Sequence, residues 1–160
     1  MTLDKRKILK ELTNKAKKEL KAAQEAYNSS HQHVTDEDLK SEGKYDTRSV
    51  EAGYLASAQK GRVEERQLEI QLLDEIVLDH DPQHIGVGSL VELLHNNQKR
   101  LYFISSTSGG TPLLIDGTPI LVISAFSPIG EQAIGLEKGE SFEVVLDNGQ
   151  TREYEVISIH

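Results

Sequence analysis

Apolar residues recur at intervals of three or four positions in the first part of the chain. This spacing places them on one face of a helix and leaves the other faces polar. The positions are Leu9, Leu12, Ala16, Leu20, Ala23 and Tyr27. They predict a first helix from about Leu3 to Tyr27, which we expect to end where Asn28-Ser29-Ser30 interrupts the pattern.

A second stretch with helical character runs from about Thr47 to Leu78 and contains no proline. Within it, apolar residues follow a heptad-like spacing. They are Val63, Ile70, Leu73 and Val77. At about 1.5 Å per residue, each helix would be on the order of 35–45 Å long. Two such helices, joined by one connection, are expected to pair as an antiparallel coiled-coil hairpin.

The pattern changes after a linker that ends at Pro82, because a proline disfavours helix at the residue before it. Beyond the linker, apolar and polar residues alternate, which is typical of strands. We predict strands near residues 89–94, 100–106, 119–124, 141–146 and 153–159, and a helical turn or two in residues 128–136. Turns are expected at Asn96-Asn97, Gly109-Gly110, Asp116-Gly117 and Asn148-Gly149, the last being the clearest hairpin signal.

The predicted fold class is therefore α+β, with two domains. Residues 1–80 form an antiparallel helical hairpin, and residues 82–160 form a small, mostly antiparallel β domain. The connection between the helices, residues 29–46, is polar and acidic and longer than most helix–helix loops. Thr35 is expected to cap a short turn that Gly43 ends, so an acidic tip is predicted near residues 35–46.

The net charge of −8 argues against free binding to duplex DNA, because a protein must bring positive charge to displace counterions from phosphates. The charge is uneven, however: residues 1–21 carry eight basic side chains and three acidic ones. Such a surface can contact nucleic acid that a partner holds, with Lys10, Lys17 and Lys21 as candidate residues. The alternative is a solvated helix face, which is common for lysine-rich helices.

The sequence has no sign of a membrane span, a secretory signal peptide or a disulfide. No run approaches the roughly 18 apolar residues needed to span a bilayer, and the chain opens with Asp4-Lys5-Arg6-Lys7 rather than a signal-peptide pattern. A soluble, cytoplasmic protein with no membrane partner is expected. The absence of cysteine excludes disulfides and thiolate metal sites. A hairpin closed within one chain is expected to be monomeric.

Four longer motifs stand out in the second half. They are Gly88-Ser89-Leu90-Val91, Ser127-Pro128-Ile129-Gly130-Glu131-Gln132-Ala133-Ile134-Gly135, Lys138-Gly139-Glu140-Ser141-Phe142-Glu143-Val144 and Tyr154-Glu155-Val156-Ile157-Ser158-Ile159. In order and spacing they resemble the Gre family of bacterial RNA polymerase accessory factors, and the second resembles that family's Ser-Pro-x-Gly-x-Ala-Leu-x-Gly segment. In this family a coiled-coil hairpin precedes a domain folded like the FKBP prolyl isomerases. With the hairpin, the similarity covers nearly the whole chain.

The family presents an aspartate at its hairpin tip, a glutamate three residues later and a tyrosine at the start of the second helix. Asp38 and Tyr45 are in register with this pattern, but the glutamate position holds Ser41, and Glu42 follows it. The resemblance implies that the carboxylates of Asp38 and Glu42 act in trans, sharing the Mg²⁺ of the polymerase active site. Mg²⁺ suits this role because it prefers oxygen ligands and keeps exchangeable waters.

The resemblance implies an elongation factor that is not itself an enzyme and has no cofactor of its own. It would bind RNA polymerase, insert its hairpin in the secondary channel, contact nascent RNA within the complex and stimulate cleavage of backtracked RNA. Docking on the polymerase is expected through Ser127, Pro128, Ile129 and Gly130. One alternative is a Gre-like regulator that binds polymerase without stimulating cleavage. Another is a coiled-coil adaptor whose helices serve only to dimerise.

The sequence raises two further possible chemistries, one in the tip and one in the β domain. His31 and His33 beside Asp36 and Asp38 could bind zinc or nickel, although this loop offers no thiolate. An FKBP-like domain could also isomerise prolyl bonds. The second half has only five tyrosines and phenylalanines and no tryptophan, and its core needs several of them, so isomerase activity is not favoured.

Overall fold

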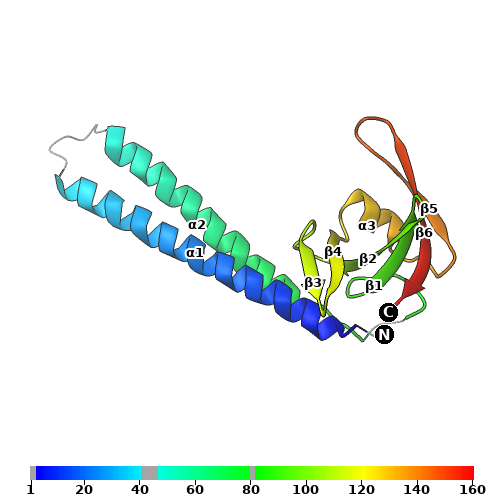
Figure 1. The fold of residues 1–160 in the computed structure, drawn as a ribbon. Helices are drawn as coiled ribbons and strands as arrows, with labels where there is room; N and C mark the ends of the chain where they lie inside the picture. Colours follow the sequence, from blue (N-terminus) through cyan, green and yellow to red (C-terminus); the bar gives the residue numbers. More distant parts are fainter. Residues whose placement is uncertain (1–2, 41–46, 80–81) are drawn as a thin grey trace. The chain divides into compact units, whose positions relative to one another are not determined.

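The computed structural model describes residues 3–40, 47–79 and 82–160, without the side chains of residues 30–40, 47–49 and 52. The chain forms two compact units. One is Thr13–Gln71, and the other joins Met1–Leu12 to Leu72–His160. The predicted fold class, a helical hairpin followed by a β domain, is confirmed (Figure 1). Among the described helices, none combines the length and the apolar character that crossing a bilayer requires.

Helix α1 spans Lys5–Lys40 and is longer than the sequence pattern predicts. The prediction that it ends at Tyr27 is wrong, and so is the separate turn capped by Thr35, because both places lie inside the helix. Asparagine and serine cost a helix less than about 0.7 kcal/mol each. No glycine or proline occurs in residues 3–42 to stop the helix. Gly43 lies outside the described residues.

Helix α2 spans Thr47–Asp74 and runs beside α1 in the opposite direction (Figure 1). It ends at Asp74 rather than at the predicted Leu78. The predicted heptad residues Val63 and Ile70 are half-buried, and Leu73 is fully buried. Val77, the fourth, lies beyond the helix and is exposed. The apolar stripe therefore holds the hairpin together as predicted, but over a shorter length.

Six strands of the described residues form one sheet in the order β3-β4-β2-β1-β6-β5. They are β1 (Leu90–His95), β2 (Gln98–Ser105), β3 (Pro112–Ile115), β4 (Thr118–Ser124), β5 (Ser141–Val145) and β6 (Thr151–Ile159). Five of them match predicted strands, and β3 is the exception. The strand pairs are antiparallel as predicted, except that β2 and β4 run parallel. The reason is β3, which reverses the chain at the sheet edge and so returns β4 to the direction of β2.

Tight turns form where the sequence predicts them. Asn96 and Asn97 join β1 to β2 with φ angles of 49° and 59°. Asp116 and Gly117 join β3 to β4 with φ angles of 49° and 79°. Left-handed conformations at both central positions define the type I′ turn, whose twist matches that of a hairpin. The predicted hairpin at Asn148-Gly149 is also present and joins β5 to β6.

One side of the sheet packs against the short helix α3 (Pro128–Ala133), which contacts β4 and β5. The core on this side is built from apolar residues of the strands and of α3. Its buried members include Ile85, Val91, Leu93, Ile104, Ile123, Ala133, Phe142, Val144 and Val156. Tyr102 and Tyr154 belong to the same cluster. The core thus draws on residues from Ile85 to Val156, nearly the whole second half of the sequence.

The first turns of α1 belong to the same compact unit as the sheet. Lys5 Nζ donates a hydrogen bond of 2.9 Å to the carbonyl oxygen of Leu78. Burial lowers the pKa of this ammonium group, and Asp79 acts in the opposite direction. Lys7 Nζ lies 2.7 Å from Asp116 Oδ2 in the turn between β3 and β4. These contacts join the first turn of α1 to Leu78 and to the turn between β3 and β4.

Candidate functional site

One of the two predicted tip carboxylates, Asp38, belongs to the end of α1. The backbone of Asp38 lies in the last turn of this helix, where the sequence predicts a loop. Ser41, Glu42 and Tyr45 lie outside the described residues. At about 1.5 Å per residue, Asp38 stands about 38 Å along the helix from Thr13, where the hairpin unit begins. The helix therefore carries one of the two predicted carboxylates to its end.

The zinc or nickel alternative is not tested by the structure. In the part of the chain that the structure describes, no group of three histidine, cysteine, aspartate or glutamate side chains is placed to hold a metal ion. The side chains of His31, His33, Asp36 and Asp38 lie outside that part, so this alternative stays a prediction.

Arg66 ties the two helices of the hairpin together. Its Nη1 atom lies 2.6 Å from Glu69 Oε2 on α2 and 3.3 Å from Glu19 Oε2 on α1. The hydrogen bond to Glu69 raises the pKa of the guanidinium, and desolvation acts against it. The Glu69 side chain is only 12% exposed, so this ion pair is partly shielded from water. That pair lies within α2, so the contact that joins the two helices is the more exposed one with Glu19, which contributes little to stability.

Gln59 lowers the stability of the same helix–helix interface. Its Oε1 atom is buried and accepts no hydrogen bond within the described residues. It follows Ala56 and precedes Val63 at the three- and four-residue spacing of the inner stripe of α2. A buried carbonyl oxygen without a donor costs about 1–3 kcal/mol. The hairpin is therefore less stable than an all-apolar stripe would make it.

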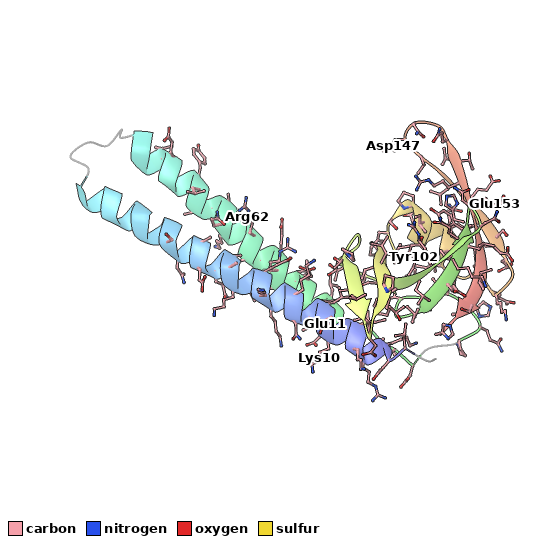
Figure 2. All side chains as sticks on the ribbon, viewed as in Figure 1. Lys10, Glu11, Arg62, Tyr102, Asp147 and Glu153 are labelled. Carbon is pink, nitrogen blue, oxygen red and sulfur yellow. The ribbon has the colours of Figure 1, made fainter. Side chains whose placement is uncertain are left out.

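The predicted basic face is exposed on α1. Lys10, Lys17 and Lys21 all have exposed side chains, and Figure 2 marks the position of Lys10. They are separated by seven and four positions, which return to nearly the same angle around a helix, so they share one face. Lys7, which precedes them, is held by Asp116 instead. Contact of the three lysines with RNA stays a prediction.

The predicted docking segment forms the start of α3. Ser127 is the N-cap of this helix: its Oγ atom accepts a hydrogen bond of 3.1 Å from the Gly130 amide. The same hydroxyl donates a hydrogen bond of 2.7 Å to the carbonyl oxygen of Ser124. Pro128 occupies the first turn, where a missing N–H leaves no helical bond unmade. The Ser-Pro pair therefore fixes the entry into the helix.

Gly130 is buried, and its lack of a side chain lets α3 approach β4 closely. A Cβ atom at this position would lie 2.0 Å from the carbonyl oxygen of Ser124 and 2.9 Å from the Cα atom of Ala125. No side chain fits there unless the backbone moves. Gly130 thus shapes the segment and presents no side chain to a partner.

Ser127, Pro128 and Ile129 line an apolar groove of about 530 Å³. Its remaining walls come from β4, from β5 and its following turn, and from the loop before β3. They are Gly109, Gly110, Leu121, Val122, Ile123, Ser124, Val144 and Leu146. Phe126, the residue before the N-cap, is 75% exposed. An exposed aromatic residue next to an apolar groove is typical of a surface that binds a protein partner.

No protein-family model and no curated protein sequence matches the chain. Several solved structures resemble it. The GreA factor homolog 1 (Gfh1) of Thermus thermophilus is 19% identical, covers 92% of this chain and 94% of its own, and has a TM-score of 0.39. Gfh1 of Thermus aquaticus is 22% identical over 94% of this chain and 95% of its own, with a TM-score of 0.40.

A third is the transcription elongation factor GreA/GreB from Nitrosomonas europaea. It is 15% identical over 66% of this chain and 87% of its own, with a TM-score of 0.38. At these identities and TM-scores, what the chain does has to be inferred from its own residues.

Sequence reasoning missed a second cavity on the sheet, which Arg100 of β2 and Arg152 of β6 both line. The two arginines are 52 positions apart, and no local motif joins them. One signal was available: residues 82–160 contain only four lysines and arginines, and both of these lie in strands.

Proposed function

We propose that this chain is a Gre-like factor that binds RNA polymerase, inserts its hairpin in the secondary channel and stimulates cleavage of backtracked RNA. The observation that carries the proposal is the place of Asp38, in the last turn of a continuous 36-residue helix. A carboxylate at the end of such a helix can reach a metal ion inside a partner, which a carboxylate on a compact surface cannot do. The choice of RNA polymerase as the partner rests on the motifs that resemble the Gre family.

The chemistry proposed for the tip needs oxygen ligands and accurate placement. Asp38 would contribute a carboxylate oxygen to the coordination of the polymerase Mg²⁺, which binds such ligands while keeping several waters. Glu42 would share the metal or orient the attacking water. Cleavage itself belongs to the polymerase, so the chain acts as an accessory factor and holds no cofactor of its own. Small displacements of a positioned group can cost about 10²-fold in rate.

A cleavage assay on a halted, backtracked elongation complex tests the tip. We expect the wild-type chain to shorten the transcript, and Asp38→Ala and Glu42→Ala each to lower the rate about 10²-fold or more. Glu25→Ala is the matched control, because Glu25 is an exposed carboxylate on the same helix, away from its end. Full activity in both tip variants would show that the tip assignment is wrong.

The apolar groove at the start of α3 is the proposed polymerase-docking surface. Its support is the exposed Phe126 beside the walls formed by Ser127, Pro128 and Ile129. We expect Phe126→Ala to weaken polymerase binding about tenfold, since aromatic anchors contribute much of the energy at interfaces. Val145→Ala, which also shortens an exposed apolar side chain, should leave binding unchanged. Equal binding by wild type and Phe126→Ala would show that the docking site lies elsewhere.

The basic face of Lys10, Lys17 and Lys21 is proposed to contact the nascent RNA. Replacing all three by glutamine should reduce crosslinking to the RNA in the complex and weaken its dependence on salt. Polymerase binding measured without RNA should be unaffected. If crosslinking stays at the wild-type level, these lysines are only a solvated helix face.

One observation favours a second candidate function. Ser41 occupies the position of the family's glutamate, and Glu42 follows one residue later. A chain with this displaced carboxylate could occupy the polymerase and modulate initiation or pausing without cleavage. Co-purification with polymerase, combined with no cleavage, would select this function. The adaptor alternative predicts a dimer, so a monomer in light scattering at micromolar concentration would exclude it.

A further inference from the structure

A second cavity, of about 390 Å³, lies on the same side of the sheet as α3. It lies at one end of this face, where β1 and β6 supply one wall and β2, β4 and α3 supply the rest. The residues of this cavity that enter the argument are Arg100, Arg152, His95, Tyr102, Leu121 and Ile129. Its size falls within the range of small-molecule sites, about 300–1,000 Å³.

The charge of this cavity is opposite to that of the domain around it. Residues 82–160 contain nine acidic side chains and four lysines and arginines. Two of the four, Arg100 and Arg152, line the cavity, and His95 adds an imidazole. No aspartate or glutamate is among the nine residues that line it. Two guanidinium groups without an acidic neighbour in the same cavity repel each other. A bound anion would relieve this repulsion.

Arg100 and Arg152 line the cavity together with Tyr102 of β2, whose position Figure 2 marks. Burial raises the pKa of the Tyr102 hydroxyl, and nearby Tyr154 adds to the increase. Arg100 and Arg152 act against the increase through their positive charge, and Arg100 also hydrogen-bonds the hydroxyl. The arginines come from strands on either side of β1. Two positive charges from different strands therefore face the same cavity.

Besides the polar Asn96 and Gln98, the cavity has an apolar and aromatic part. The Tyr102 and Tyr154 side chains are almost fully buried and form a fixed surface. The His95 ring stacks on Tyr154 at 4.8 Å between centroids, and its Nδ1 atom lies 2.9 Å from the carbonyl oxygen of Glu153. Leu121 and Ile129 complete the wall and also line the apolar groove. A flat, apolar group is the natural complement of such a surface.

We propose that this cavity binds a small phosphorylated ligand of nucleotide size, with its phosphate on Arg100 and Arg152 and its flat apolar part against Tyr102, Leu121 and Ile129. Guanidinium groups bind phosphate through paired, charge-assisted hydrogen bonds. A carboxylate would use the same donors, and an acidic side chain of a protein partner is the competing source. The free ligand is favoured because the cavity has an apolar wall as well as a cationic one.

Titration of the whole chain with adenosine monophosphate (AMP), followed by NMR, tests the proposal. We expect saturable shifts in the amide signals of Arg100, Tyr102 and Arg152, and binding of AMP about tenfold tighter than that of adenosine or inorganic phosphate. Arg100→Gln and Arg152→Gln should each weaken AMP binding about tenfold or more, because each removes one charged donor. Lys138→Gln is the control, since Lys138 is exposed in the same domain and does not line the cavity. Unchanged sheet signals in each variant show that it is folded.

Several results would overturn the proposal. One is the absence of saturable shifts at the cavity with millimolar AMP; another is equal affinity for AMP and adenosine. A third is unchanged AMP binding in both arginine variants. Weaker polymerase binding by Arg100→Gln and Arg152→Gln, with no effect on AMP, would assign the cavity to an acidic partner segment instead. Because AMP binding is measured without polymerase, its outcome is independent of the cleavage assay.

Discussion

Replacing Gly130 by alanine should destabilise the sheet domain strongly, although only one methyl group is added. The new Cβ atom would lie 2.0 Å from the carbonyl oxygen of Ser124, whereas real Cβ contacts are essentially never under 3.0 Å. The oxygen or α3 must therefore move by at least 1.0 Å, the difference between these distances. The obstacle is backbone, which cannot rotate away as the end of a side chain can.

The cost can be worked out from what holds that oxygen. It accepts hydrogen bonds from the Ser127 amide at 3.0 Å and from Ser127 Oγ at 2.7 Å. A shift of about one ångström breaks both bonds, and each contributes about 0.5–1.5 kcal/mol net. Overpacking adds about 1–3 kcal/mol. We expect Gly130→Ala to lower the free energy of unfolding by about 2–6 kcal/mol, a large share of the roughly 5–15 kcal/mol typical of a domain.

Urea unfolding, followed through the amide NMR signals of β1 and β6, measures this change. Gly86→Ala is the matched control, because a Cβ atom at Gly86 meets nothing within 4 Å. It should change stability by less than about 0.5 kcal/mol. Equal urea midpoints for Gly130→Ala, Gly86→Ala and the wild type would show that α3 and β4 do not approach as closely as described. The requirement for glycine at this position would then need another explanation.

Three further changes test other parts of the fold. Gln59→Leu should raise the free energy of unfolding of the hairpin by about 1–2 kcal/mol, because it removes a buried oxygen without a donor; a lower melting temperature by circular dichroism would contradict this. Ser127→Ala should cost about 1 kcal/mol in urea unfolding through loss of the N-cap of α3, and no loss would mean that the cap is dispensable. Asn97→Val should cost about 1–2 kcal/mol, because a β-branched residue tolerates φ of 59° poorly; an unchanged urea midpoint would indicate a different turn.

The repeating elements of the fold could be predicted from sequence because their signals are local. The helical stripe through Leu12 and Ala16 marks the inner face of α1, where both residues are buried. Asn and Asp-Gly pairs mark the type I′ turns because those residues tolerate positive φ angles. The end of α1 could not be predicted, since weak helix formers near Tyr27 do not outweigh the residues that follow them.

Long-range arrangement was harder to predict for a physical reason. Strand β3 (Pro112–Ile115) is a short apolar run without alternation, so nothing in its own residues distinguishes it from a loop. The parallel pairing of β2 with β4 depends on that strand. For the candidate sites, the Ser127 cap could be read from a local motif. That Arg100 and Arg152 line one cavity could not be predicted, because it depends on the register of β1 with two different strands.

The place of β6 inside the sheet has a consequence for how the protein folds. β6 lies between β1 and β5, and Val91 pairs with Ile159, 68 positions later. Contacts between such distant residues require large loops to close, which slows folding. During synthesis, β1 would have a free edge until β6 leaves the ribosome, and free strand edges promote aggregation. Delaying release of the last strand should therefore increase misfolding of the sheet domain, while the helices, whose hydrogen bonds are local, form without it.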